Sequence, residues 1–231
     1  MFNLHLEGAL MNVTIISASN IINKGMENGA SYRFSKIIQN ELVNMHPGSN
    51  VIIIELKNLS IHPCTGCGKC YYSHRCVLDD DFNMIYGNIV NSDIVFIISP
   101  HYAPIPSKLA AMLEKMEQIT FLHWGKDITY QSEVYGIKTG VISHGGGGTL
   151  ALDSYKNMVN DTIANALETI QMKLIPFDDH WNTGISLPVE KVTFKDDNIF
   201  PFQEYDWDFI TRKIKEYLDR IIKHIDRGNV N

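Results

Sequence analysis

The stretch Ile94-Val95-Phe96-Ile97-Ile98-Ser99-Pro100-His101-Tyr102 decides the fold of this 231-residue chain. Its first five residues are all apolar, which is typical of a strand buried on both faces of a parallel sheet. The sequence then changes to serine, proline and histidine before a helical pattern begins near Leu109. Ligands of open parallel sheets bind beyond the carboxyl ends of the strands. The stretch therefore predicts a buried strand followed by a ligand-binding loop.

Working outward from this strand, strand-like and helix-like runs alternate along the chain. Strands are expected at residues 13–17, 51–55, 94–99, 140–143 and 173–176. Apolar residues at helical spacing predict helices around residues 34–45, 109–116, 152–170 and 209–225. Gly228 is a candidate C-cap for the last helix. The alternation predicts an α/β fold with a parallel sheet covered by helices on both faces.

Length predicts one domain over residues 1–231, with a cysteine loop at 62–78 and an insertion plus C-terminal helix at 177–228. Prolines, glycines and aspartates interrupt the pattern between residues 177 and 205. We expect this part of the insertion to be either a solvent-exposed excursion or an arm lying on a partner subunit.

Charge and hydropathy exclude two classes of partner. Lys and Arg total 20 against 26 Asp and Glu, a net charge of −6, so no basic surface is expected to hold a nucleic acid. The longest apolar runs are far shorter than the roughly 20 residues of a membrane-spanning helix. The first ten residues do not resemble a signal peptide, and a cytoplasmic location is therefore expected.

Three loops at predicted strand ends carry the ligand chemistry. The first loop offers hydroxyl and amide donors for a phosphate at a helix N-terminus. The second offers rigid backbone and a tyrosine for a flat ring, and the third lets glycine backbone approach closely. The candidate residues are Ser17, Ser19, Asn28 and Ser31 in the first loop, Pro100, His101, Tyr102 and Ala103 in the second, and Ser143, His144, Gly145, Gly146 and Gly147 in the third.

Together these loops favour a mononucleotide with an aromatic ring system. Neither a G-x-x-x-x-G-K-[ST] phosphate loop nor a strict G-x-G-x-x-G motif is present, which argues against a nucleotide triphosphatase and an ordinary Rossmann enzyme. Taken singly, each loop has a plainer interpretation: a capped helix, a flexible glycine run, or polar loop positions for His101 and His144.

All four cysteines of the chain, Cys64, Cys67, Cys70 and Cys76, lie within thirteen residues. Such a cluster indicates a bound centre rather than scattered disulfides. Gly66 and Gly68 permit tight turns between the first three cysteines, and their backbone N–H groups can point at the sulfurs. Zinc, local disulfides and free cysteines remain open as alternatives.

On these loops, the sequence resembles the flavodoxin-like NAD(P)H-dependent FMN reductase family over residues 11–176. The matching positions are Ser19, Asn28 and Ser31, then Ser99 to Tyr102, then Ser143 to Gly148. The resemblance implies a flavodoxin-like, doubly wound, five-stranded sheet in the order 2-1-3-4-5. It also implies a flavin-dependent oxidoreductase that binds FMN on the candidate residues named above.

Within this family, Cys64-x₂-Cys67-x₂-Cys70-x₅-Cys76 looks most like the iron–sulfur flavoproteins. That resemblance implies a 4Fe–4S cluster on the four cysteines, electron exchange with a small molecule or a redox protein, and a homodimer or homotetramer. Two alternatives are an NAD(P)H-dependent FMN or quinone reductase without a cluster, and a non-catalytic flavin- or metal-binding protein.

Overall fold

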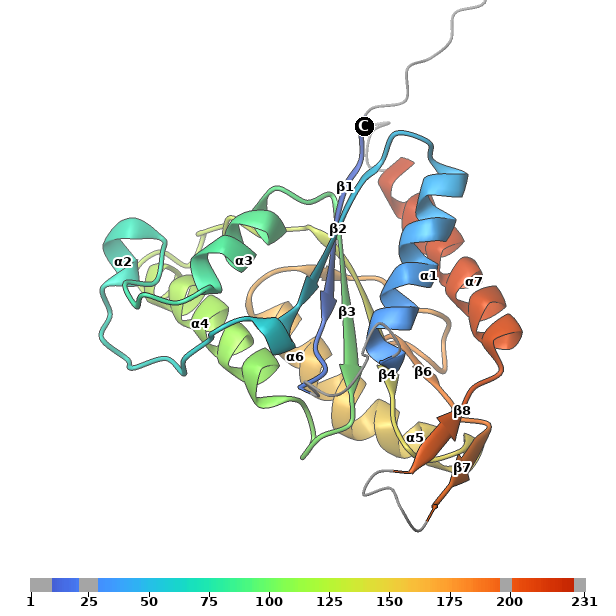
Figure 1. Cartoon of the computed structure of the whole chain (residues 1–231). Coiled ribbons are helices and arrows are strands. Elements are labelled where there is room, and N and C mark those ends of the chain that lie inside the picture. The colour runs from blue at the N-terminus through green and yellow to red at the C-terminus, as the bar shows by residue number, and fades with distance from the viewer. Residues whose placement is uncertain (1–9, 21–28, 196–200, 227–231) are drawn as a thin grey trace, which may run out of the picture.

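The computed structural model describes residues 10–20, 29–195 and 201–226 (Figure 1). A parallel sheet forms its centre, in the order β2-β1-β3-β4-β5. This arrangement confirms the predicted flavodoxin-like fold, in which the strand of the opening stretch, β3, lies in the middle and is buried throughout. The strands are β1 (Asn12–Ser17), β2 (Asn50–Glu55), β3 (Ile94–Pro100), β4 (Lys138–His144) and β5 (Lys173–Leu174).

Two short strands share the fifth position of the sheet. β5 pairs with the first two residues of β4, and β6 (Ile185–Leu187) pairs with the last three. Gly184 permits this second approach: its φ is +113°, and a Cβ there would lie 2.3 Å from the Val141 carbonyl oxygen. The expectation that residues 177–205 form an exposed excursion or a partner arm is therefore wrong for this part, because apolar burial against the chain's own sheet places β6 in the core.

Helices cover both faces of the sheet, as predicted. α1 (Ala30–Met45) and α7 (Trp207–Asp226) pack together on one face (Figure 1). The other face carries α3 (Phe82–Val90), α4 (Ser107–Trp124) and α6 (Asp161–Thr169), which enclose a second apolar cluster. No helix in the described ranges is long and apolar enough to span a membrane.

Two helical predictions need correction. Residues 152–170 do not form one α-helix: α5 (Leu152–Tyr155) leads into a π-helical turn (Lys156–Asn160), and α6 follows. α3 was not predicted, and it buries Phe82, Ile85, Tyr86 and Ile89. Gly228, the candidate C-cap of the last helix, lies outside the described residues.

The remaining elements lie near the two candidate sites. A short helix, α2 (Cys70–Ser73), follows the 3₁₀ turn Leu56–Asn58 and lies beside α4. The antiparallel pair β7 (Lys191–Thr193) and β8 (Phe202–Glu204) lies near the carboxyl edge of the sheet, where α5 begins (Figure 1). A second 3₁₀ turn, Thr149–Ala151, connects the glycine loop to α5.

Candidate functional site

Strand register brings the three predicted loops to one edge of the sheet. Ser17, at the end of β1, pairs with Ile98 of β3, and Pro100 pairs with His144 of β4. The loops that follow these strands therefore begin side by side. Asn28 lies outside the described residues, and the other candidate residues of the three loops all lie at this edge.

Side chains tie the first loop to the other two. The Ser31 hydroxyl, in the first turn of α1, lies 2.7 Å from Nε2 of His144, and both residues are buried. Tyr102 of the second loop shares a side-chain hydrogen bond with Ser19, although burial still raises the pKa of the tyrosine. Among the described residues, no side chain caps the N-terminus of α1 at Gly29. The first amides of this sixteen-residue helix are therefore available to an anion.

The glycine loop after β4 is shaped by Tyr155 of α5. The Gly147 N–H donates a 2.7 Å hydrogen bond to the tyrosine oxygen. A Cβ on Gly145 would lie 2.6 Å from that same oxygen, and one on Gly147 would lie 2.4 Å from Cβ of Ala151. Glycine is therefore required at both positions because the backbone runs against α5.

Replacing Gly147 with alanine is expected to lower the free energy of unfolding by about 1–3 kcal/mol, because the new methyl group overlaps Ala151 and Tyr155. The matched control is Gly148→Ala, since a Cβ there meets only the Val189 carbonyl oxygen, at 3.7 Å. Chemical denaturation of both variants measures the difference. Equal stability of the two would contradict the packing described for this loop.

Ser143 and His101, two other predicted residues, contact neighbouring elements of the fold. The Ser143 hydroxyl is buried and lies 2.7 Å from that of Ser186 in β6, so it joins the two strands. The His101 ring packs against the Tyr155 ring, with centroids 5.4 Å apart. Ala103, two residues further along the chain, has a φ of +48°, in the left-handed region that is uncommon for a residue other than glycine. The second loop thus turns sharply beside the glycine loop.

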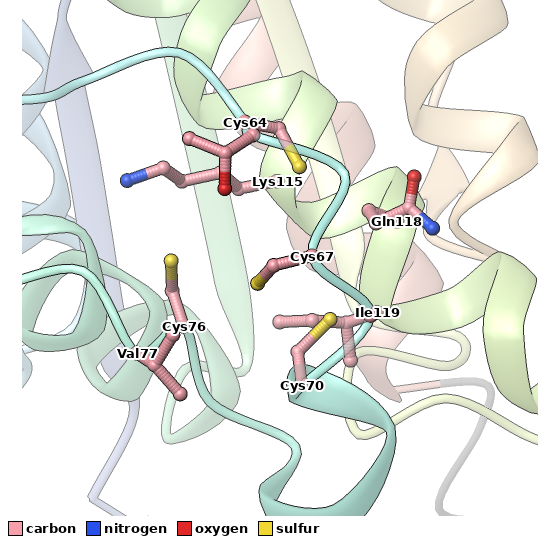
Figure 2. Close-up of a pocket in the computed structure, with 10 residues that line it drawn as sticks. Cys64, Cys67, Cys70, Cys76, Val77, Lys115, Gln118 and Ile119 are labelled. Carbon is pink, nitrogen blue, oxygen red and sulfur yellow. The ribbon is translucent and has the colours of Figure 1, made fainter.

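The four cysteines line one small hollow, which is partly open to solvent. Figure 2 shows Cys64, Cys67, Cys70 and Cys76 arranged around it, with Ile119 of α4 beside Cys67 and Cys70. All four are free thiols in this structure, so no disulfide joins them here. In the described part of the chain, no three His, Cys, Asp or Glu side chains converge on one point.

Local geometry around the sulfurs follows the predicted turns. Gly66 and Gly68 both have positive φ, 64° and 69°, and the Gly66 N–H donates to the Cys64 sulfur at 3.4 Å. Hydrogen bonds from the Lys69 backbone and the Thr65 side chain lower the pKa of the exposed Cys67 thiol. Burial, followed by the other three cysteines, raises the pKa of Cys70. Cys67 is thus more disposed than Cys70 to be a thiolate.

Helix α4 holds the cysteine loop in place. Lys115, buried in α4, forms an ion pair with the covered carboxylate of Asp80. The Cys64 N–H donates to Glu114 at 2.9 Å, and Lys108 Nζ donates to three carbonyls between residues 56 and 59. On the far side of the hollow, Asn83 both accepts from the Cys76 N–H and donates to its carbonyl.

The fold and loops agree with a comparison against known families. The model of the NADPH-dependent FMN reductase family matches residues 11–159, which is more than half of the chain. The chain belongs to that family. This FMN reductase homologue therefore carries its glycine loop and its cysteine loop within the matched region, while β6, the β7–β8 pair and α7 lie beyond it.

Individual relatives are more distant. An iron-sulfur flavoprotein of Methanosarcina thermophila is 31% identical over 61 residues, and one of Archaeoglobus fulgidus is 29% identical over 70 residues. These matches cover 26% and 30% of this FMN reductase homologue, which spans about a third (32%) of each relative. The structure of RosB with a bound riboflavin-5'-phosphate derivative is similar in fold, with a TM-score of 0.57 at 12% identity over 94% of this chain and 79% of that one.

The donors at the sheet edge fit a flavin mononucleotide. The start of α1 can receive the phosphate, and His144, whose Nε2 contacts Ser31 in the first turn of that helix, leads directly into the glycine loop. Two buried polar atoms there, Nδ1 of His144 and Oδ1 of Asn20, have no partner in the described structure. Sequence reasoning missed Tyr155, because an aromatic residue inside a helical pattern is typical of core packing.

Proposed function

We propose that this protein is an FMN-dependent electron-transfer oxidoreductase with a 4Fe–4S cluster on Cys64, Cys67, Cys70 and Cys76. The observation that carries the proposal is that these four thiols line one hollow in a chain whose sheet edge fits a flavin mononucleotide. Each thiolate of such a cluster binds a different iron, so the sulfurs need a shared hollow rather than a single point of convergence. The names of the two curated relatives agree with this choice.

When bound, the flavin exchanges one or two electrons and the cluster exchanges one, so the pair can divide a two-electron reaction into single steps. The contribution of the chain is binding and orientation. The start of α1 and Ser19 would hold the phosphate, and the backbone of Gly145 to Gly147 would lie along the ring. The Gly66 N–H would stabilise negative charge on the Cys64 sulfur.

A second candidate function is an NAD(P)H-dependent reductase of FMN or quinones, without a cluster. The matched family model, described as NADPH-dependent, favours it. The two candidate functions differ in their expected electron donors. The cluster protein should be reduced slowly by NAD(P)H and efficiently by a ferredoxin-like donor, whereas the second candidate should be reduced rapidly by NAD(P)H. Assembly into a homodimer or homotetramer is part of the first proposal.

Anaerobic purification followed by an absorbance spectrum and by iron, sulfide and flavin assays tests the proposal. We expect one FMN per chain, with iron and sulfide near the roughly four of each that a 4Fe–4S cluster requires. Flavin without iron and sulfide would favour the second candidate. Absence of all three after anaerobic reconstitution would contradict both functions.

A further inference from the structure

His144 contacts all three loops at the carboxyl edge of the sheet, where the proposed flavin site lies. His144 ends β4, and its backbone continues directly into Gly145 of the third loop. Its Nε2 lies 2.7 Å from the hydroxyl of Ser31, 113 positions earlier in the chain. Its carbonyl oxygen accepts a 2.9 Å hydrogen bond from the His101 N–H in the second loop. The three loops therefore meet at His144.

The surroundings of His144 favour a structural bond over a charged contact. The residue is 5% exposed and Ser31 is 2% exposed, and the imidazole packs edge-on against Phe34, one turn along α1, with ring centroids 5.0 Å apart. Burial lowers the pKa of His144 to about 3, so the ring is neutral at physiological pH. A neutral ring does not attract a phosphate by charge, but it does form a directed hydrogen bond.

We infer that His144 is a positioning residue for the flavin: through Nε2 it holds Ser31 and the start of α1 against the glycine loop. This contact fixes the spacing between the phosphate end and the ring end of the site, which lie on elements far apart in sequence. The inference rests on the proposed function, because it assigns His144 a part in binding the same flavin.

Glutamine and asparagine variants distinguish the two ring nitrogens. A glutamine amide reaches about as far as Nε2, whereas an asparagine amide reaches about as far as Nδ1, the atom without a partner. His144→Asn is expected to weaken FMN binding about tenfold, since it leaves the buried Ser31 hydroxyl unpaired. His144→Gln is expected to stay within about threefold of the native chain.

The assay is quenching of flavin fluorescence, with FMN and with riboflavin, which lacks the phosphate. Because the contact sets the position of the phosphate end, the preference for FMN over riboflavin should fall in the asparagine variant and persist in the glutamine variant. Ser31→Ala should weaken FMN binding to the same degree as His144→Asn. The double variant Ser31→Ala with His144→Asn should bind FMN little more weakly than either single variant, because both substitutions remove the same hydrogen bond. Thermal melting of each variant confirms that it is folded.

Equal losses of FMN affinity in His144→Gln and His144→Asn would overturn the inference. A loss of affinity in His144→Gln alone would also overturn it, because that result would assign the effect to Nδ1. Additive losses in the double variant would also overturn it. These outcomes require that the native chain binds FMN. Failure of the native chain to bind FMN would instead overturn the proposed function, and this inference with it.

Discussion

Replacing Asp80 with alanine is expected to lower the free energy of unfolding by about 3–5 kcal/mol, because it leaves the Lys115 ammonium buried without a counterion. The carboxylate also accepts hydrogen bonds from the backbone N–H groups of His62 and Phe82, and these are lost as well. For a chain of this length the melting temperature should fall by about 10 °C. Chemical and thermal denaturation monitored by circular dichroism measure both quantities.

The neighbouring residue provides a matched control. Asp79 is exposed, so Asp79→Ala should change the free energy of unfolding by less than about 0.5 kcal/mol. Replacing both partners, Asp80→Leu with Lys115→Met, should recover most of the loss, because no unpaired charge then remains buried. An Asp80→Ala variant as stable as Asp79→Ala would mean that the ion pair does not anchor the loop.

Acid should weaken the same ion pair. Burial raises the pKa of Asp80, but hydrogen bonds from Lys115 and then from the backbone outweigh it, so the pKa in the folded chain lies below its ordinary value. The stabilisation is therefore present above the unfolded-state pKa of about 4 and is lost as pH falls through the folded-state pKa. The stability difference between the native chain and Asp80→Ala should accordingly narrow below about pH 4.

Replacing Cys67 with serine is expected to remove most of the iron and sulfide while FMN remains bound. The proposed cluster depends on all four thiolates, and Cys67 is the exposed cysteine whose pKa is lowered. Because the side chain is exposed, serine should alter stability little. Iron, sulfide and flavin are assayed per chain after anaerobic reconstitution of the native and variant proteins.

His74→Asn is the control for this substitution. His74 lies within the same loop and has a φ of +53°, a backbone conformation that asparagine tolerates. If the cysteines alone are ligands, this variant should keep its iron. Unchanged iron in Cys67→Ser would contradict the assigned ligands, and joint loss of iron and FMN would indicate that the loop is chiefly structural.

The sequence predicted the sheet because its central strands have unambiguous patterns. The apolar run of β3 and the alternation of elements around it are sufficient for the strand order once the family resemblance is added. β6 was missed because three residues, Ile185 to Leu187, are too few to show a period among glycines and prolines. α3 was missed although Phe82, Ile85, Tyr86 and Ile89 follow helical spacing, because nine residues contain only one such repeat.

The candidate sites, too, could be predicted from the sequence only in part. The four cysteines could be grouped from spacing alone because they lie in one short segment. The bond between Ser31 and His144 and the ion pair between Lys115 and Asp80 join residues that are 113 and 35 positions apart, so only the folded chain brings them together. Neither residue pair leaves a periodic signal in one sequence.

Helix α4 gives the cysteine loop a property that small metal-binding modules lack. Modules that order only around their metal unfold when it leaves. Here Glu114 binds the loop itself, and Lys108 and Lys115 bind the residues that flank it, through hydrogen bonds and an ion pair that involve no cofactor atom. Loss of the proposed cluster to oxygen would therefore leave the protein folded with its four cysteines still close together, so that repair would require fresh iron and sulfide rather than a new chain.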